Sequence, residues 1–261
     1  MRAEVAVISP ARGFIAEHAH YMDDAGFWEA HAARLGGPVI DLGAAAGRTA
    51  IPIALLGIDV IAVDSDPEML EVLWERAEGT QAAARVTLVE GLMQDAALPT
   101  GAALVIVPMN TLQVLVDPVD RAQCFAHVAA SLRPGGEFIF DLAIPDLDAI
   151  EWAIGDTIST GRSRDPATGD VLVHTAVFDS LDRTSHTLDF RVIVERARAA
   201  GSTQRVERRH LVHQYTYNEV QTLVASAGLT VLAVHSGFRG ERFTDSSERQ
   251  VWRCACQGPS A

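Results

Sequence analysis

The first half of the chain alternates short apolar runs with amphipathic stretches. The runs have the length and continuous hydrophobicity of strands buried on both faces. They lie at 38–43, 59–64, 85–90, 103–108 and 137–142. The stretches between them predict helices at 49–56, 67–78 and 119–132. Repeated strand–helix units predict a parallel sheet with right-handed crossovers.

The pattern changes after about residue 148. Period-two alternation there is typical of a small antiparallel sheet. Its segments lie near 156–162, 170–180, 185–196 and 204–215. A helix at 217–227 and strands near 229–235 and 249–256 then suit a final antiparallel hairpin on the first sheet. The expected fold class is α/β: a seven-stranded, mostly parallel sheet with helices on both faces, plus an inserted small antiparallel sheet.

Composition narrows the possible functions. The chain has 261 residues, 48% of them hydrophobic, which suffices for a sizeable core. The formal net charge of −13 disfavours a nucleic-acid surface, which needs a basic footprint. There is no lysine, so Schiff-base chemistry and a lysine general base are excluded.

Targeting signals and cysteines add little. No apolar run reaches the length of a membrane span, and the N-terminus lacks a signal-peptide pattern. Cys124, Cys254 and Cys256 predict neither a disulfide framework nor a metal site. We therefore expect a cytoplasmic protein without membrane or nucleic-acid partners and without a metal.

A turn of small residues, Gly43–Gly47, separates the first apolar run from a helix, and Asp64 ends the next run. Small residues let the backbone approach a ligand, the helix N-terminus offers N–H groups, and the carboxylate can hold ribose hydroxyls. This layout predicts a site for a nucleoside-containing cofactor. The dinucleotide spacing G-x-G-x-x-G would fall on Gly43, Ala45 and Arg48. Arginine at the third position disfavours a nicotinamide oxidoreductase.

The spacing Asp41-x-Gly43-x-Ala45-x-Gly47 resembles the acid-x-Gly-x-Gly-x-Gly signature of class I S-adenosylmethionine-dependent methyltransferases. The resemblance implies a Rossmann-like fold in which this loop contacts S-adenosylmethionine. Gly43 and Gly47 would pass close to the cofactor, and Asp41 would fix the turn or the methionine amine. Ala45 stands in place of the family's central glycine. Arg48 has two candidate partners, the cofactor carboxylate or a sheet neighbour.

The next two strand ends carry weaker parts of the same resemblance. Asp64–Ser65 resembles the family's second motif, in which the acid binds the ribose hydroxyls and the following residue lines the adenine. Leu92 occupies the position where the family often places an acid that accepts from the adenine amine. That contact is then assigned to a backbone group near Met93, or to Gln94 or Asp95.

The fourth strand ends at Pro108, which the resemblance places beside the cofactor and the transferring methyl group. The family's Asn/Asp-Pro-Pro-aromatic clamp for a planar amide or base is absent, which again disfavours nucleic-acid methylation. Asn110 is a candidate to present its carbonyl oxygen to an amine. The alternative is that Asn110 only caps a turn.

Three further side chains are candidates for catalysis. His213 and Tyr215 would share one face of a strand, where they could take a proton from an ammonium or a phenol. As a sheet-surface pair, they would need no function. Tyr21 matches a tyrosine often found in the N-terminal segment that covers the cofactor in this family, or it packs on a helix.

The resemblance also divides the chain. It implies an N-terminal helical lid over 1–36 and a cofactor-binding core over 37–147 and 216–261. The inserted sheet over 148–215 would wall the acceptor pocket or form a homodimer contact.

We predict an S-adenosylmethionine-dependent methyltransferase that yields S-adenosylhomocysteine and methylates a small-molecule or short-peptide amine, as in natural-product branches of the family. An O-methyltransferase is the nearest alternative, and it would need a base such as His213 or His210 near the methyl group. A protein that binds the cofactor without transferring methyl is a further alternative, favoured by Ala45 and Leu92.

Overall fold

The computed structural model describes residues 10–18, 21, 23, 24, 26–164, 169–197 and 203–256. The chain divides into two compact units, and each is described by itself. Unit 1 contains the segment Asp146–His213 together with the chain up to Met22. Unit 2 contains Asp23–Pro145 and the chain from Gln214 onward.

The N-terminal segment is shared between the units. Helix α1 (Pro10–His18) belongs to unit 1, whereas α2 (Phe27–Leu35) belongs to unit 2. The helical lid expected over 1–36 stays a prediction, as does the role of the inserted sheet.

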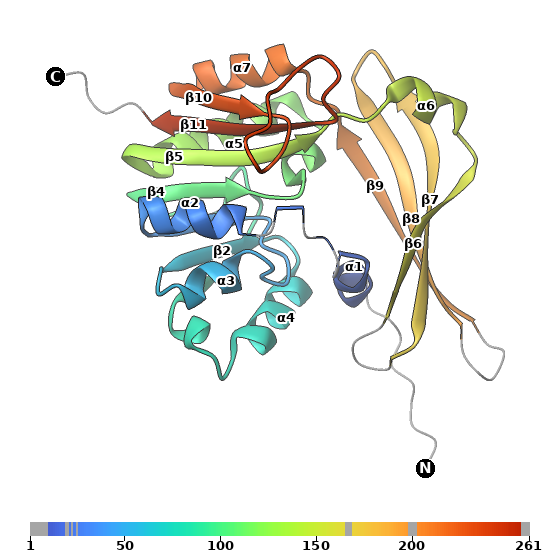
Figure 1. Ribbon diagram of the computed structural model, residues 1–261, viewed down its shortest axis with the longest axis horizontal. Coiled ribbons are helices and arrows are strands. Elements are labelled where there is room, and N and C mark those ends of the chain that lie inside the picture. Colours follow the sequence, from blue (N-terminus) through green and yellow to red (C-terminus); the bar gives the residue numbers. More distant parts are fainter. Residues whose placement is uncertain are drawn as a thin grey trace. The chain divides into compact units, whose positions relative to one another are not determined.

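Unit 2 is built on a seven-stranded sheet in the order β10-β11-β5-β4-β1-β2-β3 (Figure 1). The strands are β1 (Val39–Leu42), β2 (Val60–Asp64), β3 (Val86–Glu90), β4 (Ala102–Val107), β5 (Leu132–Ala143), β10 (Leu229–His235) and β11 (Arg249–Cys256). Strands β1 to β5 pair in parallel, and β11 pairs antiparallel with both β5 and β10. The predicted fold class, including the final hairpin, is confirmed.

The helices of unit 2 pack on both faces of this sheet. Besides α2, they are α3 (Ala50–Leu55), α4 (Pro67–Ala77), α5 (Pro118–Ser131) and α7 (Tyr217–Ser226), with 3₁₀ turns η1 (Gln81–Ala84) and η2 (Thr111–Val114). Asp66 and Asp117 cap α4 and α5 by accepting from backbone N–H groups, and each is followed by proline at the first helical position. Local sequence therefore sets where both helices begin.

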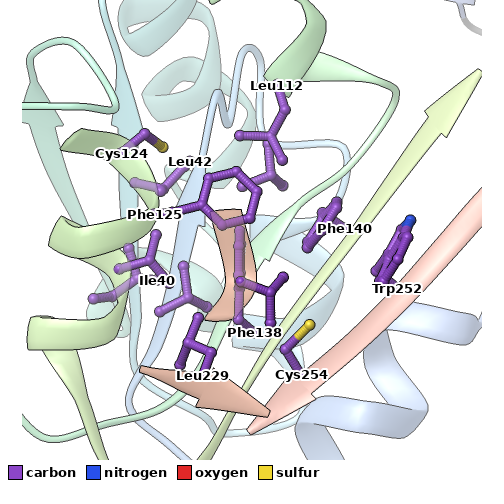
Figure 2. Close-up of a cluster of buried hydrophobic side chains, with 14 of the residues drawn as sticks. Ile40, Leu42, Leu112, Cys124, Phe125, Phe138, Phe140, Leu229, Trp252 and Cys254 are labelled. Atoms are coloured by element: carbon purple, nitrogen blue, oxygen red, sulfur yellow. The ribbon is translucent and has the colours of Figure 1, made fainter. Parts of the chain in front are cut away.

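Two cores lie on the two faces, because successive strand residues point to opposite sides. Ile40 and Leu42 of β1 join a core with α5 and α7 that includes Phe125 and Trp252, shown in Figure 2. Val39 of β1 joins the other core, with residues of α2, α3 and α4. Packing on both faces of the sheet holds the strand ends of unit 2 in fixed relative positions.

Strand β1 lies where the order of the sheet reverses. The chain proceeds from β1 to β2 and β3 on one side, and from β4 to β5 on the other. In open α/β sheets, ligands bind outside the carboxyl ends of the strands at this switch point. The loops after β1, β2 and β4 are therefore the expected place for a ligand. No helix in the described part of the chain is long and apolar enough to cross a membrane.

Unit 1 holds a second sheet in the order β6-β7-β8-β9, with every pair antiparallel, as expected for the insertion. Its elements, besides α1, are α6 (Leu147–Trp152), β6 (Thr157–Arg164), β7 (Val171–Asp182), β8 (Thr187–Ala197) and β9 (Thr203–His213). One face has a small core of Leu172, Val192 and Val194. Salt bridges such as Arg191–Asp179 also connect its strands.

Candidate cofactor and methyl-transfer site

The loop after β1 is held in left-handed backbone conformations. Gly43, Ala45 and Gly47 have φ angles of 73°, 44° and 76°. Glycine adopts such angles at no steric cost, whereas alanine pays a penalty of about 1 kcal/mol or more. The alanine therefore keeps the backbone shape expected of a glycine at this position, at some cost in stability.

Neighbouring side chains explain why the outer two positions are glycine. A Cβ atom at Gly43 would lie 2.4 Å from Thr111 Cγ2, and one at Gly47 would lie 2.7 Å from Leu73 Cγ. Both distances are shorter than real contacts allow. The loop after β1 is thus packed directly against the turn that follows β4, because Thr111 belongs to that turn. The cofactor loop and the predicted methyl-transfer position are neighbours.

Asp64, at the end of β2, accepts backbone hydrogen bonds on both carboxylate oxygens. The Ala45 amide donates to Oδ2 at 2.8 Å, and the Asp66 amide donates to Oδ1 at 3.0 Å. Burial raises the pKa of Asp64, and these amides oppose that shift. The carboxylate is therefore fixed beside the cofactor loop, where the sequence predicts that it meets the ribose. Ser65, the next residue, is exposed.

Asp41 lies in β1 and is fully buried. Thr49 Oγ1 donates to its Oδ2 at 2.5 Å, while no described residue donates to Oδ1. Burial raises the pKa of Asp41 to about 7, against the lowering effects of Thr49 and Arg48. An unsatisfied buried carboxylate oxygen is costly and calls for a donor. A ligand ammonium group is such a donor.

Arg48 is held by a carboxylate that the sequence analysis did not consider. Its guanidinium donates to both oxygens of Asp24 at 2.7 and 2.8 Å. Asp24 is almost fully buried and also accepts from Trp28 Nε1 at 2.6 Å. Arg48 is therefore paired with the segment before α2, and it also lowers the pKa of Asp41 in β1. Arginine and carboxylate together fix that segment against the start of α3.

The loop after β3 offers one buried acceptor. The side chain of Leu92 is 48% exposed, and its carbonyl oxygen accepts from the amides of Asp95 and Ala96. Met93 packs against the core beneath α5 and α7. Gln94 Oε1 is buried, and no described residue donates to it. Among the side chains predicted for the adenine amine, Gln94 is the one with a free buried oxygen.

The turn after β4 contains two consecutive non-glycine residues in the left-handed backbone conformation. Pro108 is buried, and both Met109 and Asn110 have left-handed φ angles, of 58° and 60°. Asn110 makes no capping hydrogen bond with its side chain, and its Oδ1 is buried without a donor among the described residues. The capping alternative is therefore not supported. Strained backbone and an unpaired acceptor together indicate a functional position.

The segment that follows is structural. Gln113 is buried, donates to Gln214 Oε1 at 2.9 Å and accepts from the Ala143 amide at 3.2 Å. Tyr215 donates its hydroxyl to the Leu112 carbonyl at 3.0 Å. These bonds hold η2, and with it the turn before it.

The predicted pairing of His213 with Tyr215 is corrected by the structure. Strand β9 ends at His213, so Tyr215 lies outside it and belongs to unit 2. Burial raises the pKa of Tyr215 far above its usual value, which keeps the phenol protonated and so without the phenolate that would act as a base. His213 is buried in unit 1, where its ring stacks on His186 at 6.2 Å between centroids. Tyr21 also belongs to unit 1 and is partly buried.

One buried carboxylate at this edge of the sheet was missed. Asp141, near the end of β5, is fully buried and accepts from Arg249 Nη1 at 3.1 Å. Burial raises its pKa to about 6, while Arg249 and the amides of Met109 and Asn110 lower it. A lone acid within the apolar run Phe138–Leu142 was the signal that could have found it.

The residues present fit S-adenosylmethionine. The left-handed loop at Gly43–Gly47 lies at the switch point, and Asp64 lies at the end of the neighbouring strand β2. Buried acceptor oxygens without described donors occur on Asp41 and Gln94. These match the chemistry of a cofactor that carries an ammonium group, ribose hydroxyls and an adenine amine.

Comparisons with known proteins agree with this geometry. Residues 39–136 match the protein family described as "Methyltransferase domain", a span that covers the strand ends described above. The cypemycin N-terminal methyltransferase of a Streptomyces species is 24% identical over 216 residues, 83% of this chain and 82% of that protein.

Solved structures show the same fold. The CcbJ methyltransferase from Streptomyces caelestis is 25% identical with a TM-score of 0.76, covering 90% of this chain and 96% of that one. CalS10, an amino pentose methyltransferase from Micromonospora echinaspora solved with bound S-adenosylmethionine, is 17% identical with a TM-score of 0.67, covering 94% of both chains. The cofactor is S-adenosylmethionine, and residues 39–136 form a methyltransferase domain whose strand order and loop Gly43–Gly47 are of the class I S-adenosylmethionine-dependent type.

Proposed function

We propose that this protein transfers the methyl group of S-adenosylmethionine to an amine nitrogen of a small natural product or short peptide. The observation that carries the proposal is Asn110. Its side-chain oxygen is buried without a described donor, in a strained turn that packs against the cofactor loop through Thr111. An amine N–H group would satisfy that oxygen. A hydroxyl would do so as well, and the printed activities of relatives support the amine over the alcohol.

The names of relatives point the same way. One is the cypemycin N-terminal methyltransferase, another is an amino pentose methyltransferase, and MtfA is a glycopeptide N-methyltransferase. Each of these printed activities involves an amine-bearing natural product or peptide. They support an amine acceptor here and do not distinguish between a sugar and a peptide.

Each candidate residue has one role in this proposal. Bound S-adenosylmethionine supplies an activated methyl group for in-line displacement. Asp64 holds the ribose hydroxyls, Asp41 Oδ1 accepts from the methionine ammonium, and Gln94 Oε1 accepts from the adenine amine. Asn110 Oδ1 accepts one N–H of the neutral amine and so orients its lone pair toward the methyl carbon.

Proton removal needs little help from the protein when the acceptor enters as a free amine. The Tyr215 hydroxyl donates to the Leu112 carbonyl, which argues against Tyr215 as the base. His213 and His210 remain the candidate bases on which an O-methyltransferase would depend. Homodimer formation through the inserted sheet and a cytoplasmic location remain predictions.

The first experiment is calorimetric titration with S-adenosylhomocysteine, with NAD as control, followed by a screen of amines and alcohols with labelled methyl donor. Binding of S-adenosylhomocysteine alone and labelling of amines are expected. Asn110→Gly keeps the left-handed backbone but removes the acceptor oxygen. It should lower turnover by about tenfold to a hundredfold and leave S-adenosylhomocysteine binding unchanged. Labelling of alcohols only would overturn the assignment to an amine.

A further inference from the structure

The loop after β1 enters helix α3 through two side chains that are both held by carboxylates. Thr49, the N-cap residue of α3, makes no capping hydrogen bond with its side chain, and its hydroxyl donates to Asp41 Oδ2 instead. Arg48, which follows Gly47 directly, donates to Asp24 through both terminal nitrogens of its guanidinium. One carboxylate comes from β1 and the other from the segment before α2. The second of these connections has a consequence for the cofactor.

Asp24 is a buried and fully engaged carboxylate. It is 1% exposed, and Arg48 Nη1 and Nη2 donate to its two oxygens at 2.7 and 2.8 Å. Trp28 Nε1 donates to Oδ2 as well, at 2.6 Å. A bidentate, charge-assisted pair fixes both the distance and the orientation of the groups it joins, and burial protects it from screening by salt. Trp28 belongs to the same buried core as Ala44 of the loop, so α2 and the loop share both a polar and an apolar connection.

The loop needs such connections because its backbone conformation is costly. Ala45 is a non-glycine residue with a φ angle of 44°, which persists only where the surroundings hold it. From the side of β2 and α4, the Ala45 amide donates to Asp64 Oδ2 at 2.8 Å, and Arg76 Nη1 donates to the carbonyl of the next residue at 2.6 Å. Asp24 adds an anchor from the side of α2.

Helix α2 is also tied down near its other end, by a second buried carboxylate. Arg34 donates to Glu137 Oε2 at 2.8 Å, and Glu137 pairs with Arg253 of β11 as well. In the register of the sheet, Glu137 lies beside Leu104, which lies beside Val39, the first residue of β1. Glu137 is therefore level with the start of β1, whereas the cofactor loop follows the end of that strand. The two carboxylates hold the same helix, but only Asp24 also holds the loop region.

We propose that Asp24 is a positioning residue for S-adenosylmethionine: by holding Arg48, it fixes the loop Gly43–Gly47 and the start of α3 in the conformation that binds the cofactor. The inference rests on the cofactor and is independent of the amine proposed as the methyl acceptor. Glu137 secures the same helix without affecting the cofactor, which makes it the matched control.

Calorimetric titration of the full chain with S-adenosylhomocysteine tests the proposal. Asp24→Asn keeps the side-chain shape and an oxygen for Trp28 but removes the charge, so it should weaken binding by about tenfold. Glu137→Gln should change the affinity by less than about twofold. Wild-type affinity in Asp24→Asn would overturn the proposal. Equal weakening by both variants would overturn it too, because any loosening of α2 would then be sufficient.

A double variant shows whether Asp24 acts through Arg48 and allows for loss of folding in the single variant. Asp24→Asn removes the anion from a buried ion pair, a change that destabilises proteins strongly. Adding Arg48→Gln removes the opposing charge, so the double variant should regain folding stability in urea. It should still bind S-adenosylhomocysteine about as weakly as either single variant. Losses of affinity that add up in the double variant would show that the two residues act independently, and would overturn the proposal.

Two further measurements separate positioning from general destabilisation. In the ligand-free protein, hydrogen–deuterium exchange of a peptide covering 43–53 should rise in Asp24→Asn and stay unchanged in Glu137→Gln. With an amine found by the screen, Asp24→Asn should raise KM for S-adenosylmethionine by about tenfold while kcat changes by less than about twofold. A lower kcat with an unchanged KM would indicate inactive protein and would refute positioning.

Discussion

Asp41 makes the folding stability of the ligand-free protein depend on pH in an unusual direction. Its folded pKa is raised from 3.8 to about 7 because it is fully buried. A carboxyl group with a raised folded pKa contributes stability that is fully present below the unfolded pKa and is lost as pH rises through the folded pKa. Asp41→Asn removes this titration and keeps an oxygen for Thr49. The difference in unfolding free energy between wild type and variant should therefore fall as pH rises.

The magnitude follows from the two pKa values. Their separation of about three units corresponds to about 4 kcal/mol in total. Between pH 5 and pH 8, wild type should lose about 2.5 kcal/mol relative to Asp41→Asn, with the steepest change below pH 7. Urea unfolding at half-unit pH steps measures this difference, and the variant is the reference that cancels all other titrating groups.

Glu137→Gln provides a control of opposite sign. Burial acts to raise the pKa of Glu137, but Arg34 and Arg253 together hold it below its usual value. Its contribution is therefore present above pH 4.5 and constant between pH 5 and pH 8. A flat difference for Asp41→Asn over the same range would refute the argument that this carboxyl is buried without an adequate donor. A flat difference only with saturating S-adenosylhomocysteine would instead support the ammonium as the missing donor.

Three further predictions concern the same edge of the sheet. Asp64→Ala should weaken S-adenosylhomocysteine binding by about tenfold to a hundredfold in calorimetry, since it removes a charged acceptor for the ribose; wild-type affinity would disprove the ribose assignment. Gly43→Ala should lower the unfolding free energy by about 1–3 kcal/mol, because its Cβ would meet Thr111 Cγ2, and Thr111→Ser should recover part of that loss. Tyr215→Phe should lower the unfolding free energy by about 1–2 kcal/mol in urea, because it leaves the Leu112 carbonyl unpaired. The pH profile of turnover should not change, and a shifted profile would show that the phenol takes part in catalysis.

The elements of this fold are predictable because their signals are local. Continuous apolar runs and period-two segments placed the strands of both sheets, and the predicted bounds of β10 and β11 match the structure. The loop Gly43–Gly47 was equally predictable, because left-handed backbone angles and close packing both require glycine at Gly43 and Gly47. At these two positions, the local backbone conformation and the tertiary packing both require glycine.

The end of β9 shows where this approach fails. Apolar and polar residues keep alternating through Tyr215, so the sequence predicts a strand that continues to that residue. The chain leaves the strand at His213 because Gln214 and Tyr215 bond to Gln113 and Leu112, which are about a hundred positions earlier. A contact between such distant segments leaves no periodic trace in either of them.

Contacts between distant segments also explain why the roles of Asp24 and Asp141 were not predicted from the sequence. Arg48 has an evident cationic role at a helix start, but its partner Asp24 comes from a segment without strand or helix pattern. Asp141 is visible only as one acid in an apolar run, and its meaning depends on Arg249 from a strand added at the end of the chain. Buried charge therefore carries information that hydrophobic periodicity lacks: because an isolated buried carboxylate is unstable, each one implies a partner to be found. For Asp141 Oδ2 that partner is Arg249, and for Asp41 Oδ1 we expect it in the cofactor.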